Sequence, residues 1–207
     1  MHLETLPREW DLIIIGGGVT GAGILREAAR MGFQALLLER HDFAWGTSSR
    51  SSKMVHGGFR YLKEGKFSLT RIAVKERERL LKEASGLVEP LGFLLPVYTD
   101  RGLSRWSLKV GLSIYDLFSA KKGHDYYRRH DFSMLAAHLK QDHLVGGFRF
   151  SDAQVDDARL VLRLIHEACE SGCEVKALNY TTVNRITRNR GGAVNGVYVI
   201  DTETVRE

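Results

Sequence analysis

The stretch Asp11-Leu12-Ile13-Ile14-Ile15-Gly16-Gly17-Gly18-Val19-Thr20-Gly21 decides the fold of this chain. Its continuous apolar run, residues 11–15, is typical of a strand buried on both faces of a parallel sheet. The alanine-rich residues 19–31 behind the glycines predict a helix that ends at Gly32, and residues 34–39 predict a second strand. A strand, a glycine turn, a helix and a strand within about thirty residues predict a βαβ unit with a right-handed crossover.

The glycine turn fits the pattern G-x-G-x-x-G. Gly16 permits the tight turn, Gly18 lets the backbone approach a pyrophosphate, and Gly21 lets the helix pack closely on the sheet. The phosphates then face the free N–H groups and the positive dipole end of the helix. Glu39, at the end of the second strand, can accept hydrogen bonds from ribose hydroxyls. In this context the pattern predicts a bound dinucleotide, but it does not decide between FAD and NAD.

Composition places the chain among ordinary globular proteins, with 43% apolar and 27% charged residues in a length of 207. The net charge of +5 suits anionic small molecules or an anionic membrane surface. No nucleic-acid-binding motif is present, so nucleic acid is not an expected partner. We interpret Cys169 and Cys173 as small apolar residues at a helix-to-strand turn, rather than a redox pair or half a metal site, which favours a reducing cytoplasm. The sequence shows neither a secretory signal nor an apolar run of about 18 residues that would span a bilayer.

Residues 41–66 are rich in glycine, serine and histidine, and a structureless stretch of that length is usually functional. Beyond it, the pattern predicts helices at 67–84, 104–120 and 157–170, and strands at 94–99, 148–155, 174–178, 180–188 and 193–202. Asp157 is predicted to cap the last helix, with Asp156 as a structural partner. A carboxylate pair for acid–base work is the alternative interpretation of these two residues.

Specific motifs connect this long segment to a known family. The sequence TSSRSSK at 47–53 is followed by HGGFRYL at 56–62. Together with the glycine turn, they make nearly the whole chain resemble the FAD-dependent glycerol-3-phosphate dehydrogenases. Further segments that resemble the family are residues 15–23, 38–40, 115–116 and 155–160. Departures from the family pattern lie in the first helix, at Leu25, Glu27 and Met31, and they leave the phosphate loop intact.

The resemblance implies an α/β fold, with a Rossmann-like parallel sheet that binds FAD and a second, mixed α/β substrate region. Residues 1–90 are expected to form the FAD-binding βαβ unit with the flavin and substrate loop. Residues 91–150 are expected to be an insertion of helices and strands in the substrate region, and residues 151–207 to return to the FAD-binding domain with a β-hairpin. The family is more than twice as long, and its late glycine-rich segment has no counterpart here, so we expect the parallel sheet to be incomplete in this chain.

The resemblance also implies which residues contact FAD. In the glycine turn and at the end of the second strand these are Gly16, Gly17, Gly18, Val19, Thr20, Gly21, Glu39 and Arg40. In the serine loop, residues 47–53, they are Thr47, Ser48, Ser49, Ser52 and Lys53. Hydroxyls, backbone N–H groups and cations of this kind can hold a pyrophosphate and the polar edge of a ring. An ordinary polar surface loop is the alternative.

Three residues, His56, Arg60 and Tyr61, are expected to act on the substrate. An imidazole titrates near neutrality, so His56 can take the proton of a secondary alcohol while hydride leaves carbon for the flavin. A structural histidine, with a base beyond residue 207, is the alternative. The guanidinium of Arg60 can hold a phosphomonoester by paired hydrogen bonds, and Tyr61 can add its hydroxyl; a surface arginine is the alternative. No metal site is expected, because the other histidines lack metal-ligand spacing.

The resemblance implies oxidation of sn-glycerol 3-phosphate to dihydroxyacetone phosphate with reduction of FAD, followed by electron transfer to quinone or oxygen. A related flavin-dependent oxidase of amines or amino acids and a non-catalytic FAD-binding fragment are the alternatives. A cytoplasmic protein, peripheral on the inner face of the cell membrane, fits delivery of electrons to membrane quinone. Residues 104–120 can lie in a membrane interface, but burial in the protein is favoured because apolar residues surround the helix. A homodimer remains open.

Overall fold

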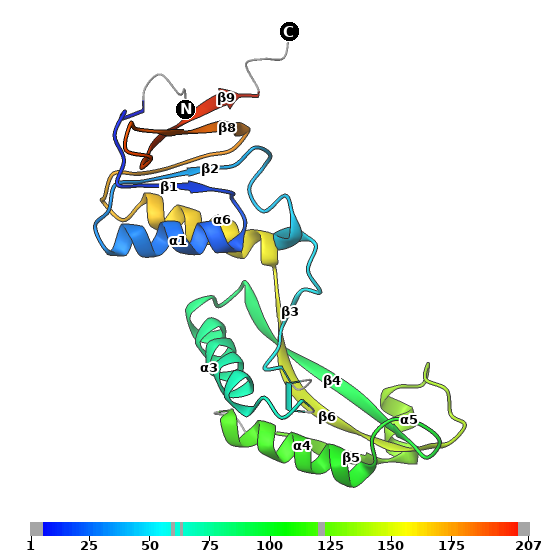
Figure 1. Ribbon diagram of the computed structural model, residues 1–207. Coiled ribbons are helices and arrows are strands. Elements are labelled where there is room, and N and C mark those ends of the chain that lie inside the picture. Colours follow the sequence, from blue (N-terminus) through cyan, green and yellow to red (C-terminus); the bar gives the residue numbers. More distant parts are fainter. Residues whose placement is uncertain (1–5, 59–60, 63, 120–122, 203–207) are drawn as a thin grey trace. The chain divides into compact units, whose positions relative to one another are not determined.

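The computed structural model describes residues 6–58, 61–62, 64–119 and 123–202 (Figure 1). The chain divides into two compact units. Unit 1 consists of Met1–Ser52 and Asp156–Glu207, and unit 2 of Lys53–Val155. These limits differ from the expected boundaries at residues 90 and 150, because strands within residues 53–90 pair with a strand of unit 2.

The parallel sheet of unit 1 contains β1 (Leu12–Ile15), β2 (Ala35–Leu38) and β7 (Val175–Leu178), in the order β1-β2-β7. Neighbouring strands are parallel, with Leu12 opposite Ala35 and Leu38 opposite Leu178. β2 is buried along its whole length, as its run Ala-Leu-Leu-Leu predicts for a strand covered on both faces. The parallel α/β fold expected from the sequence is therefore confirmed.

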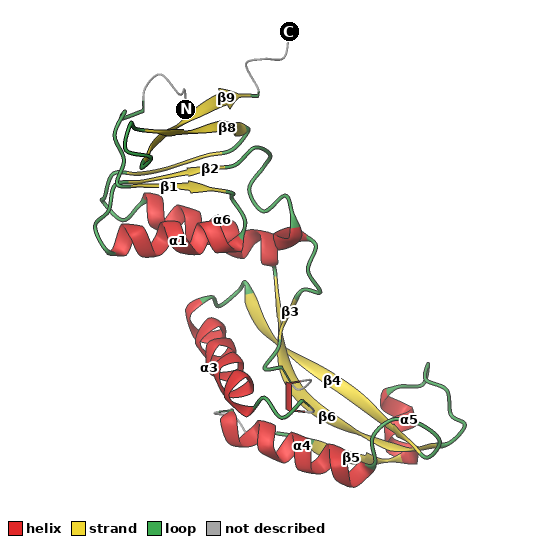
Figure 2. Ribbon diagram, viewed as in Figure 1, coloured by secondary structure: helices red, strands yellow, loops and turns green. Residues whose placement is uncertain are grey.

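Two helices and a hairpin of unit 1 cover opposite faces of this sheet (Figure 2). The helices are α1 (Val19–Arg30) and α6 (Asp157–Cys169), and the hairpin strands are β8 (Thr181–Arg188) and β9 (Val194–Asp201). On the helical face, Leu25 of α1 and Val161 of α6 belong to one fully buried cluster. On the other face, Val197 of the hairpin packs against Leu36 and Leu38 of β2. Burial on both faces explains why β2 reads as a continuous apolar run, whereas in β1 Ile14 is buried and Ile15 is 55% exposed.

Unit 2 is built on an antiparallel sheet with helices packed against it (Figure 2). Its strands are β3 (Met54–Val55), β4 (Val88–Tyr98), β5 (Asp125–Arg128) and β6 (Leu144–Val155), and its helices are α3 (Phe67–Glu83), α4 (Arg105–Phe118) and α5 (Arg129–Leu135). β6 pairs with each of the other strands, and its register with β4 places Val88 opposite Val155. Leu108 and Leu112 of α4 are buried against Phe148 of β6. The sheet and α4 thus share one apolar core.

The predicted helices, and the predicted strands of unit 1, are confirmed to within two residues at each end. The strands predicted at 94–99 and 148–155 are too short, because β4 begins at Val88 and β6 at Leu144. Pro90 interrupts the strand pattern in the sequence, but β4 pairs with β6 alone among the described strands, and such an edge position tolerates proline. β5 and α5 are not predicted, because both are short and mostly polar.

The predicted cap of α6 is wrong by one residue. Asp156 is the N-cap, and its Oδ1 accepts a hydrogen bond from the N–H of Arg159 at 3.1 Å. Asp157 is the first residue of the helix. Its carboxylate is therefore available for a different contact, which lies in the serine loop.

Candidate functional site

The glycine turn of unit 1 joins the carboxyl end of β1 to the amino end of α1. Gly16 has a φ of 111°, a left-handed conformation that residues with side chains rarely adopt. A Cβ atom at Gly21 would collide with the carbonyl oxygen of Gly16. Gly21 therefore allows α1 to pack directly against the turn, which is the role that the glycine pattern predicts for it.

The amino end of α1 is suited to an anion. Gly18 is the N-cap and offers no side chain, and the first turn of the helix contains no acidic residue. The N–H of Val19 donates to Oγ of Ser48 at 2.9 Å, so the serine loop reaches this end of the helix. The nearest atom to a Cβ built at Gly18 would be the same Oγ, at 3.1 Å. The positive dipole end of α1 therefore meets a hydroxyl and an uncovered backbone, while Thr20 is exposed beside them.

Glu39 follows β2, and its carboxylate accepts hydrogen bonds from the backbone of the glycine turn and from the backbone just after Glu39 itself. Its Oε2 accepts a hydrogen bond from the N–H of Gly17 at 2.7 Å, and its Oε1 accepts one from the N–H of His41 at 2.8 Å. A Cβ atom at Gly17 would come to 2.7 Å from the ring of Phe43, so this close approach requires glycine. A carboxylate has about four acceptor positions, which leaves capacity for the hydroxyls of a ribose. Arg40, next in the chain, is exposed.

The serine loop is attached to α6 by one carboxylate. The loop includes the 3₁₀-helix η2 (Thr47–Ser49), and Ser52 at its end is exposed. Oδ2 of Asp157 accepts hydrogen bonds from Oγ of Ser51 at 2.7 Å and from its N–H at 3.3 Å. Asp157 is 8% exposed, and shielding from water strengthens such bonds. Sequence reasoning assigned Asp157 to a cap and missed this contact.

Lys53 begins unit 2 in a backbone conformation that is uncommon for a residue with a side chain. Its φ is 59°, in the left-handed region. Its carbonyl oxygen accepts a hydrogen bond from the N–H of Val155 at 2.9 Å, next to the pairing of β3 with β6. Strain of this kind costs about 1–3 kcal/mol and is concentrated at functional sites. Ala44, His143 and Tyr180 share a positive φ outside the predicted site, so the ligand contact of Lys53 stays a prediction.

The histidine turn, residues 56–58, follows β3. His56 is exposed, and its Nδ1 accepts a hydrogen bond from the N–H of Gly58 at 3.1 Å. This contact assigns the proton of the neutral imidazole to Nε2, which becomes a donor. Gly58 has a φ of 71°, and the ring of Tyr61 lies against it. Arg60 lies outside the described residues.

A buried polar cluster lies under Gly57 and is absent from the sequence-based prediction. It consists of Arg77 of α3, Tyr115 of α4 and Asp152 of β6, which are 3%, 2% and 5% exposed. Arg77 stands among charged neighbours in its helix, a context that indicates solvent. The signal in the sequence that points to the cluster is Asp152, a carboxylate inside a largely apolar strand.

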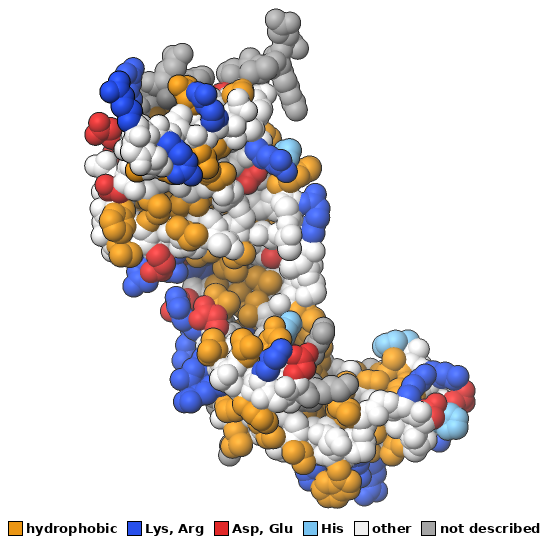
Figure 3. Space-filling view, in the orientation of Figure 1, with side chains coloured by type: hydrophobic (Ala, Val, Ile, Leu, Met, Phe, Trp, Pro, Cys, Tyr) orange, Lys and Arg blue, Asp and Glu red, His pale blue; other side chains and the backbone are white. Residues whose placement is uncertain are grey.

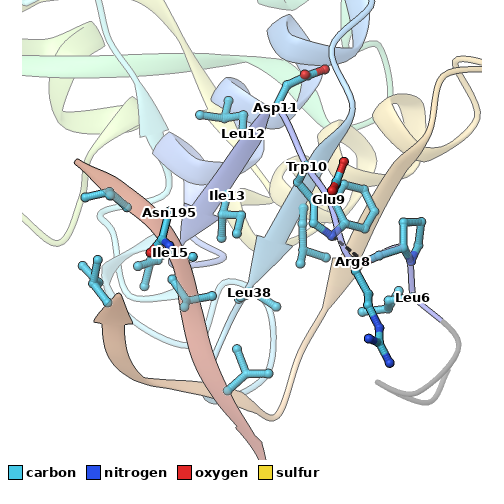
Figure 4. A pocket seen from close by; sticks show the side chains of 17 residues that line it. Leu6, Arg8, Glu9, Trp10, Asp11, Leu12, Ile13, Ile15, Leu38 and Asn195 are labelled. Atoms are coloured by element: carbon cyan, nitrogen blue, oxygen red, sulfur yellow. Dashed lines mark hydrogen bonds between the residues drawn. The ribbon is translucent and has the colours of Figure 1, made fainter. Parts of the chain in front are cut away.

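A depression of about 1140 Å³, lined by apolar and polar residues, lies elsewhere in unit 1 (Figure 4). Its lining includes Trp10, Ile13, Ile15 and Asn195 of β9, and Figure 4 shows Asn195 next to Ile15. None of the described residues predicted to contact the dinucleotide lines it. We therefore assign the depression to the apolar face of the sheet and not to the nucleotide site.

Two negative results concern the described ranges. Within residues 6–58, 61–62, 64–119 and 123–202, no three His, Cys, Asp or Glu side chains gather in a way that could hold a metal ion. In the same part of the chain, no helix combines the length and the hydropathy that crossing a bilayer requires.

Comparisons with known proteins agree with this geometry. Residues 11–207 match the family described as FAD dependent oxidoreductase. Aerobic glycerol-3-phosphate dehydrogenase of Staphylococcus aureus (strain USA300) is 39% identical over 196 residues, which are 93% of this chain. The chain spans 35% of the length of that relative.

Solved structures show the same likeness. Glycerol-3-phosphate dehydrogenase from Bacillus halodurans, complexed with FAD, has a TM-score of 0.72 at 31% identity, over 97% of this chain and 32% of that one. L-α-glycerophosphate oxidase from Mycoplasma pneumoniae, with FAD bound, has a TM-score of 0.69 at 18% identity, over 92% of this chain and 49% of that one. L-proline dehydrogenase from P. horikoshii has a TM-score of 0.71 at 21% identity, over 94% and 50%. These last two likenesses show the fold alone.

The resemblance predicted from the motifs is confirmed by the dehydrogenase relatives, which are enzymes. FAD is the cofactor of the family that the chain matches from residue 11 onward. The chain belongs to the FAD-dependent oxidoreductase family.

Proposed function

We propose that the protein oxidises sn-glycerol 3-phosphate to dihydroxyacetone phosphate, with FAD as the first electron acceptor and quinone or oxygen as the second. The observation that carries this proposal is the serine loop followed by the histidine turn, in a chain 39% identical to an aerobic glycerol-3-phosphate dehydrogenase. Because the chain covers 35% of that relative, the activity, the substrate and the partners are proposed for the whole protein.

The residues of unit 1 fit the dinucleotide part of FAD. The amino end of α1 is suited to the pyrophosphate, since Gly18 leaves the backbone uncovered and Ser48 adds a hydroxyl. Glu39 supplies a carboxylate for the adenosine ribose. The other residues proposed to contact the cofactor are Gly16, Gly17, Val19, Thr20, Gly21, Arg40, Thr47, Ser49, Ser52 and Lys53.

Bound FAD supplies an acceptor for the hydride that leaves the secondary carbon of the substrate. The substrate hydroxyl loses its proton to a base in the same reaction, and the two losses together convert the alcohol to a ketone. The substrate phosphate carries a charge of about −1.5 to −2 near neutral pH. Arg60 and Tyr61 are the residues proposed to hold that phosphate, by paired hydrogen bonds and by a hydroxyl.

His56 is the proposed proton acceptor, and its contact with Gly58 sets a condition on that role. While Nδ1 accepts from the N–H of Gly58 at 3.1 Å, Nε2 carries the proton and can only donate. The imidazole takes the hydroxyl proton once it has changed tautomer or turned away from Gly58. His56→Asn keeps a polar side chain but removes the titrating ring, so we expect kcat to fall ~100-fold or more. A pH profile of kcat that is unchanged near neutrality would assign the proton to another residue.

Two alternative functions predict different results. A related oxidase of amines or amino acids shares the fold, as the likeness to L-proline dehydrogenase shows, but such amino acids carry a carboxylate in place of a phosphate. A non-catalytic FAD-binding fragment is the other alternative. Arg60→Ala distinguishes these functions. A loss of activity confined to phosphorylated substrates supports the proposed enzyme, and the absence of any effect supports the fragment.

Stopped-flow reduction of the flavin in the full-length protein tests the proposal. Reduction by sn-glycerol 3-phosphate, with none by glycine or L-proline at equal concentration, supports the proposed substrate. Reduction by an amino acid alone supports the oxidase, and no reduction by any of them supports the fragment. Reoxidation by a quinone analogue or by oxygen then identifies the electron acceptor.

The 207 residues by themselves are expected to hold FAD weakly and to turn over poorly. The reason is that the chain spans only 35% of its dehydrogenase relative. Stable yellow colour after gel filtration, together with steady dye reduction by sn-glycerol 3-phosphate, would contradict this expectation.

We also propose a cytoplasmic protein that lies on the inner face of the cell membrane. Leu108 and Leu112 bury one side of α4, so the burial favoured by the sequence holds for that side. The exposed apolar residues of α4 are Trp106, Val110 and Leu117, at 73%, 56% and 76%. Figure 3 shows apolar and basic side chains close together over this helix. Binding to anionic vesicles that Trp106→Ser weakens would support contact of α4 with the membrane.

The oligomeric state is a separate question. Light scattering of the full-length protein would decide whether it forms a homodimer.

A further inference from the structure

The buried polar cluster of unit 2 holds the backbone of the histidine turn. We call Arg77, Tyr115 and Asp152 the Arg77 cluster. The N–H of Gly57 donates to Oη of Tyr115 at 2.7 Å and, over a longer distance of 3.3 Å, to Oδ1 of Asp152. We propose that the Arg77 cluster is a positioning device, which fixes the peptide backbone at Gly57 and, through it, the direction of the His56 imidazole.

The hydroxyl of Tyr115 is held in one orientation. A hydroxyl has one donor position and two acceptor positions. Its O–H donates to Oδ2 of Asp152 at 3.1 Å, while its oxygen accepts from Gly57 at 2.7 Å and from Nη1 of Arg77 at 2.9 Å. Turning Oη away from Gly57 would therefore leave this buried donor with only its longer bond to Asp152, at 3.3 Å. The direction of the Gly57 N–H is fixed as a consequence.

Burial and neighbouring charges keep Tyr115 and Arg77 each in one protonation state. Burial, followed by the negative charge of Asp152, raises the pKa of Tyr115 above its usual range, so the phenol keeps its proton. Burial alone would lower the pKa of Arg77, but its hydrogen bonds to Asp152 and Glu78 and the nearby charges outweigh that effect and raise it. A neutral phenol beside a charged guanidinium is therefore the state in which the turn is held.

Arg77 connects the cluster to three elements of unit 2. Its Nη1 donates to Asp152 of β6 at 2.9 Å, and its Nη2 donates to Glu78 of α3 at 2.6 Å and to Ser119, at the end of α4, at 3.0 Å. A planar guanidinium fixes the directions of these bonds, which the single ammonium of lysine cannot do. The support beneath Gly57 is thus tied to both helices and to the sheet.

The backbone of the histidine turn packs directly against the Arg77 cluster. A Cβ atom at Gly57 would collide with Oη of Tyr115 and with Val74, so only glycine lets the backbone N–H reach the phenol. The neighbouring N–H of Gly58 holds Nδ1 of His56. The N–H of Gly57 belongs to the peptide unit between His56 and Gly57, so holding it restricts the backbone from which the His56 side chain projects and to which Gly58 is joined.

Stability alone explains the cluster poorly. A buried ion pair is often no more stabilising than apolar side chains of the same volume. In addition, Nε of Arg77 is buried and has no hydrogen-bond partner among the described residues. The geometric result of the arrangement, a fixed N–H at Gly57, is what apolar residues could not provide.

Tyr115→Phe tests the positioning directly, since it removes one oxygen atom and keeps the packed ring. Imidazole ¹⁵N spectra report the tautomer of His56, and hydrogen exchange reports the N–H of Gly57, without any need for catalysis. We expect the Gly57 amide to exchange at least ~10-fold faster in the variant. We also expect the His56 ring to lose its single Nε2–H form. Unchanged exchange together with an unchanged tautomer overturns the proposal.

Asp116→Asn is the matched control, because Asp116 is next to Tyr115 in α4 but contacts His124 at 2.7 Å. It should alter the ring signals of His124 and leave those of His56 as they are. Equal changes at His56 in both variants would indicate general loosening of unit 2 and overturn the proposal. If Tyr115→Phe does not fold, the unmodified chain still decides, since a Gly57 amide that exchanges as fast as in an unstructured peptide overturns it.

The catalytic consequence of this positioning rests on the proposed function. The backbone fixed at Gly57 also sets where the imidazole lies once it has released Gly58 and can accept the proton. In the full-length protein with FAD, we therefore expect Tyr115→Phe to lower kcat for sn-glycerol 3-phosphate ~10-fold, because a small misplacement of a catalytic group has effects of that order. KM should stay within ~2-fold, since the cluster acts through the turn. An inactive unmodified protein would overturn the proposed function and leave the spectroscopic result standing. Full kcat in a variant whose imidazole has moved would overturn the catalytic part of this inference.

Discussion

The glycine turn of unit 1 and the histidine turn of unit 2 both use glycine to leave space beside the backbone, but different groups occupy that space. In unit 1, the nearest atom to a Cβ built at Gly18 is the flexible hydroxyl of Ser48, at 3.1 Å. In unit 2, the room beside Gly57 is filled by Tyr115 and Val74. The backbone at Gly18 is therefore open to the ligand that we propose, whereas the backbone at Gly57 is occupied by the protein's own interior.

This difference shows that a glycine motif does not identify a ligand site by itself. The same absence of a side chain serves the amino end of α1 in one unit and a buried polar cluster in the other. The serine loop and the histidine turn are also held differently. The carboxylate of Asp157 holds the serine loop, and the Arg77 cluster, from two helices and a strand, holds the histidine turn. A substitution at Gly18 should mainly change ligand binding, and a substitution at Gly57 should mainly change stability and geometry.

The largest effect is expected from Gly57→Ala. The added methyl group collides with Tyr115 and Val74, so we expect the free energy of unfolding to fall by about 3 kcal/mol, as for an overpacked core. Urea unfolding followed by circular dichroism measures this loss. Gly46→Ala is the control, since a Cβ atom there meets no described atom within 4 Å. Equal stability of the two variants would remove the contrast between the turns.

Gly18→Val should separate ligand binding from stability. A branched side chain at the N-cap keeps a pyrophosphate from the amide groups, and a hydrogen bond to a charged group contributes about 1.5–3 kcal/mol. We therefore expect FAD affinity to fall at least ~10-fold in the full-length protein. The free energy of unfolding should fall by only about 1 kcal/mol, the effect of a poor N-cap residue.

Quenching of flavin fluorescence measures the affinity of this variant. Gly23→Ala lies in the same helix, where a Cβ atom meets no described atom within 4 Å, and should retain the affinity of the parent. A Gly18→Val protein that takes up FAD as well as its parent does would refute the assignment of the glycine turn to the nucleotide.

The βαβ unit could be predicted because its signals are local. The apolar run, the glycines and Glu39 all lie within residues 11–39, and each has a physical reason that does not depend on the rest of the chain. The same holds for Gly21, whose contact with Gly16 is a property of the turn itself. Sequence reasoning therefore recovered β1, α1 and β2, and the ligand contacts of the glycine turn stay predictions.

The Arg77 cluster could not be predicted in this way. Arg77 and Asp152 are 75 positions apart in the sequence, and the pairing becomes visible only when α3 packs near β6. The charged neighbours of Arg77 in α3 follow the pattern of a solvated face, although the residue itself is 3% exposed. The contact of Asp157 with Ser51 escaped prediction for a related reason, since the two residues lie 106 positions apart.

Alkaline pH should destabilise unit 2 through Tyr115. In the unfolded chain a phenol loses its proton at about pH 10, whereas burial raises the pKa of Tyr115 in the folded protein. The unfolded state therefore binds fewer protons above that pH, and the free energy of unfolding falls by up to about 1.4 kcal/mol per pH unit.

Urea midpoints of the parent and of Tyr115→Phe, compared between about pH 9 and 11, isolate this contribution from that of the other tyrosines. The stability difference between the two proteins should shrink as the pH rises. A constant difference would mean that Tyr115 titrates normally, and the buried hydroxyl would then not be the fixed support that distinguishes unit 2.

The smallest effect separates the two carboxylates at the start of α6. In Asp157, Oδ1 accepts from the N–H of Ala158 and Oδ2 accepts from Ser51, so an asparagine there cannot accept at both positions. We expect Asp157→Asn to lower the free energy of unfolding by about 1 kcal/mol, and to speed hydrogen exchange in the serine loop. Asp156→Asn should change neither, because asparagine caps a helix as well as aspartate does. If both substitutions loosened the serine loop equally, its attachment would depend on the charge of the helix start and not on the bond from Ser51.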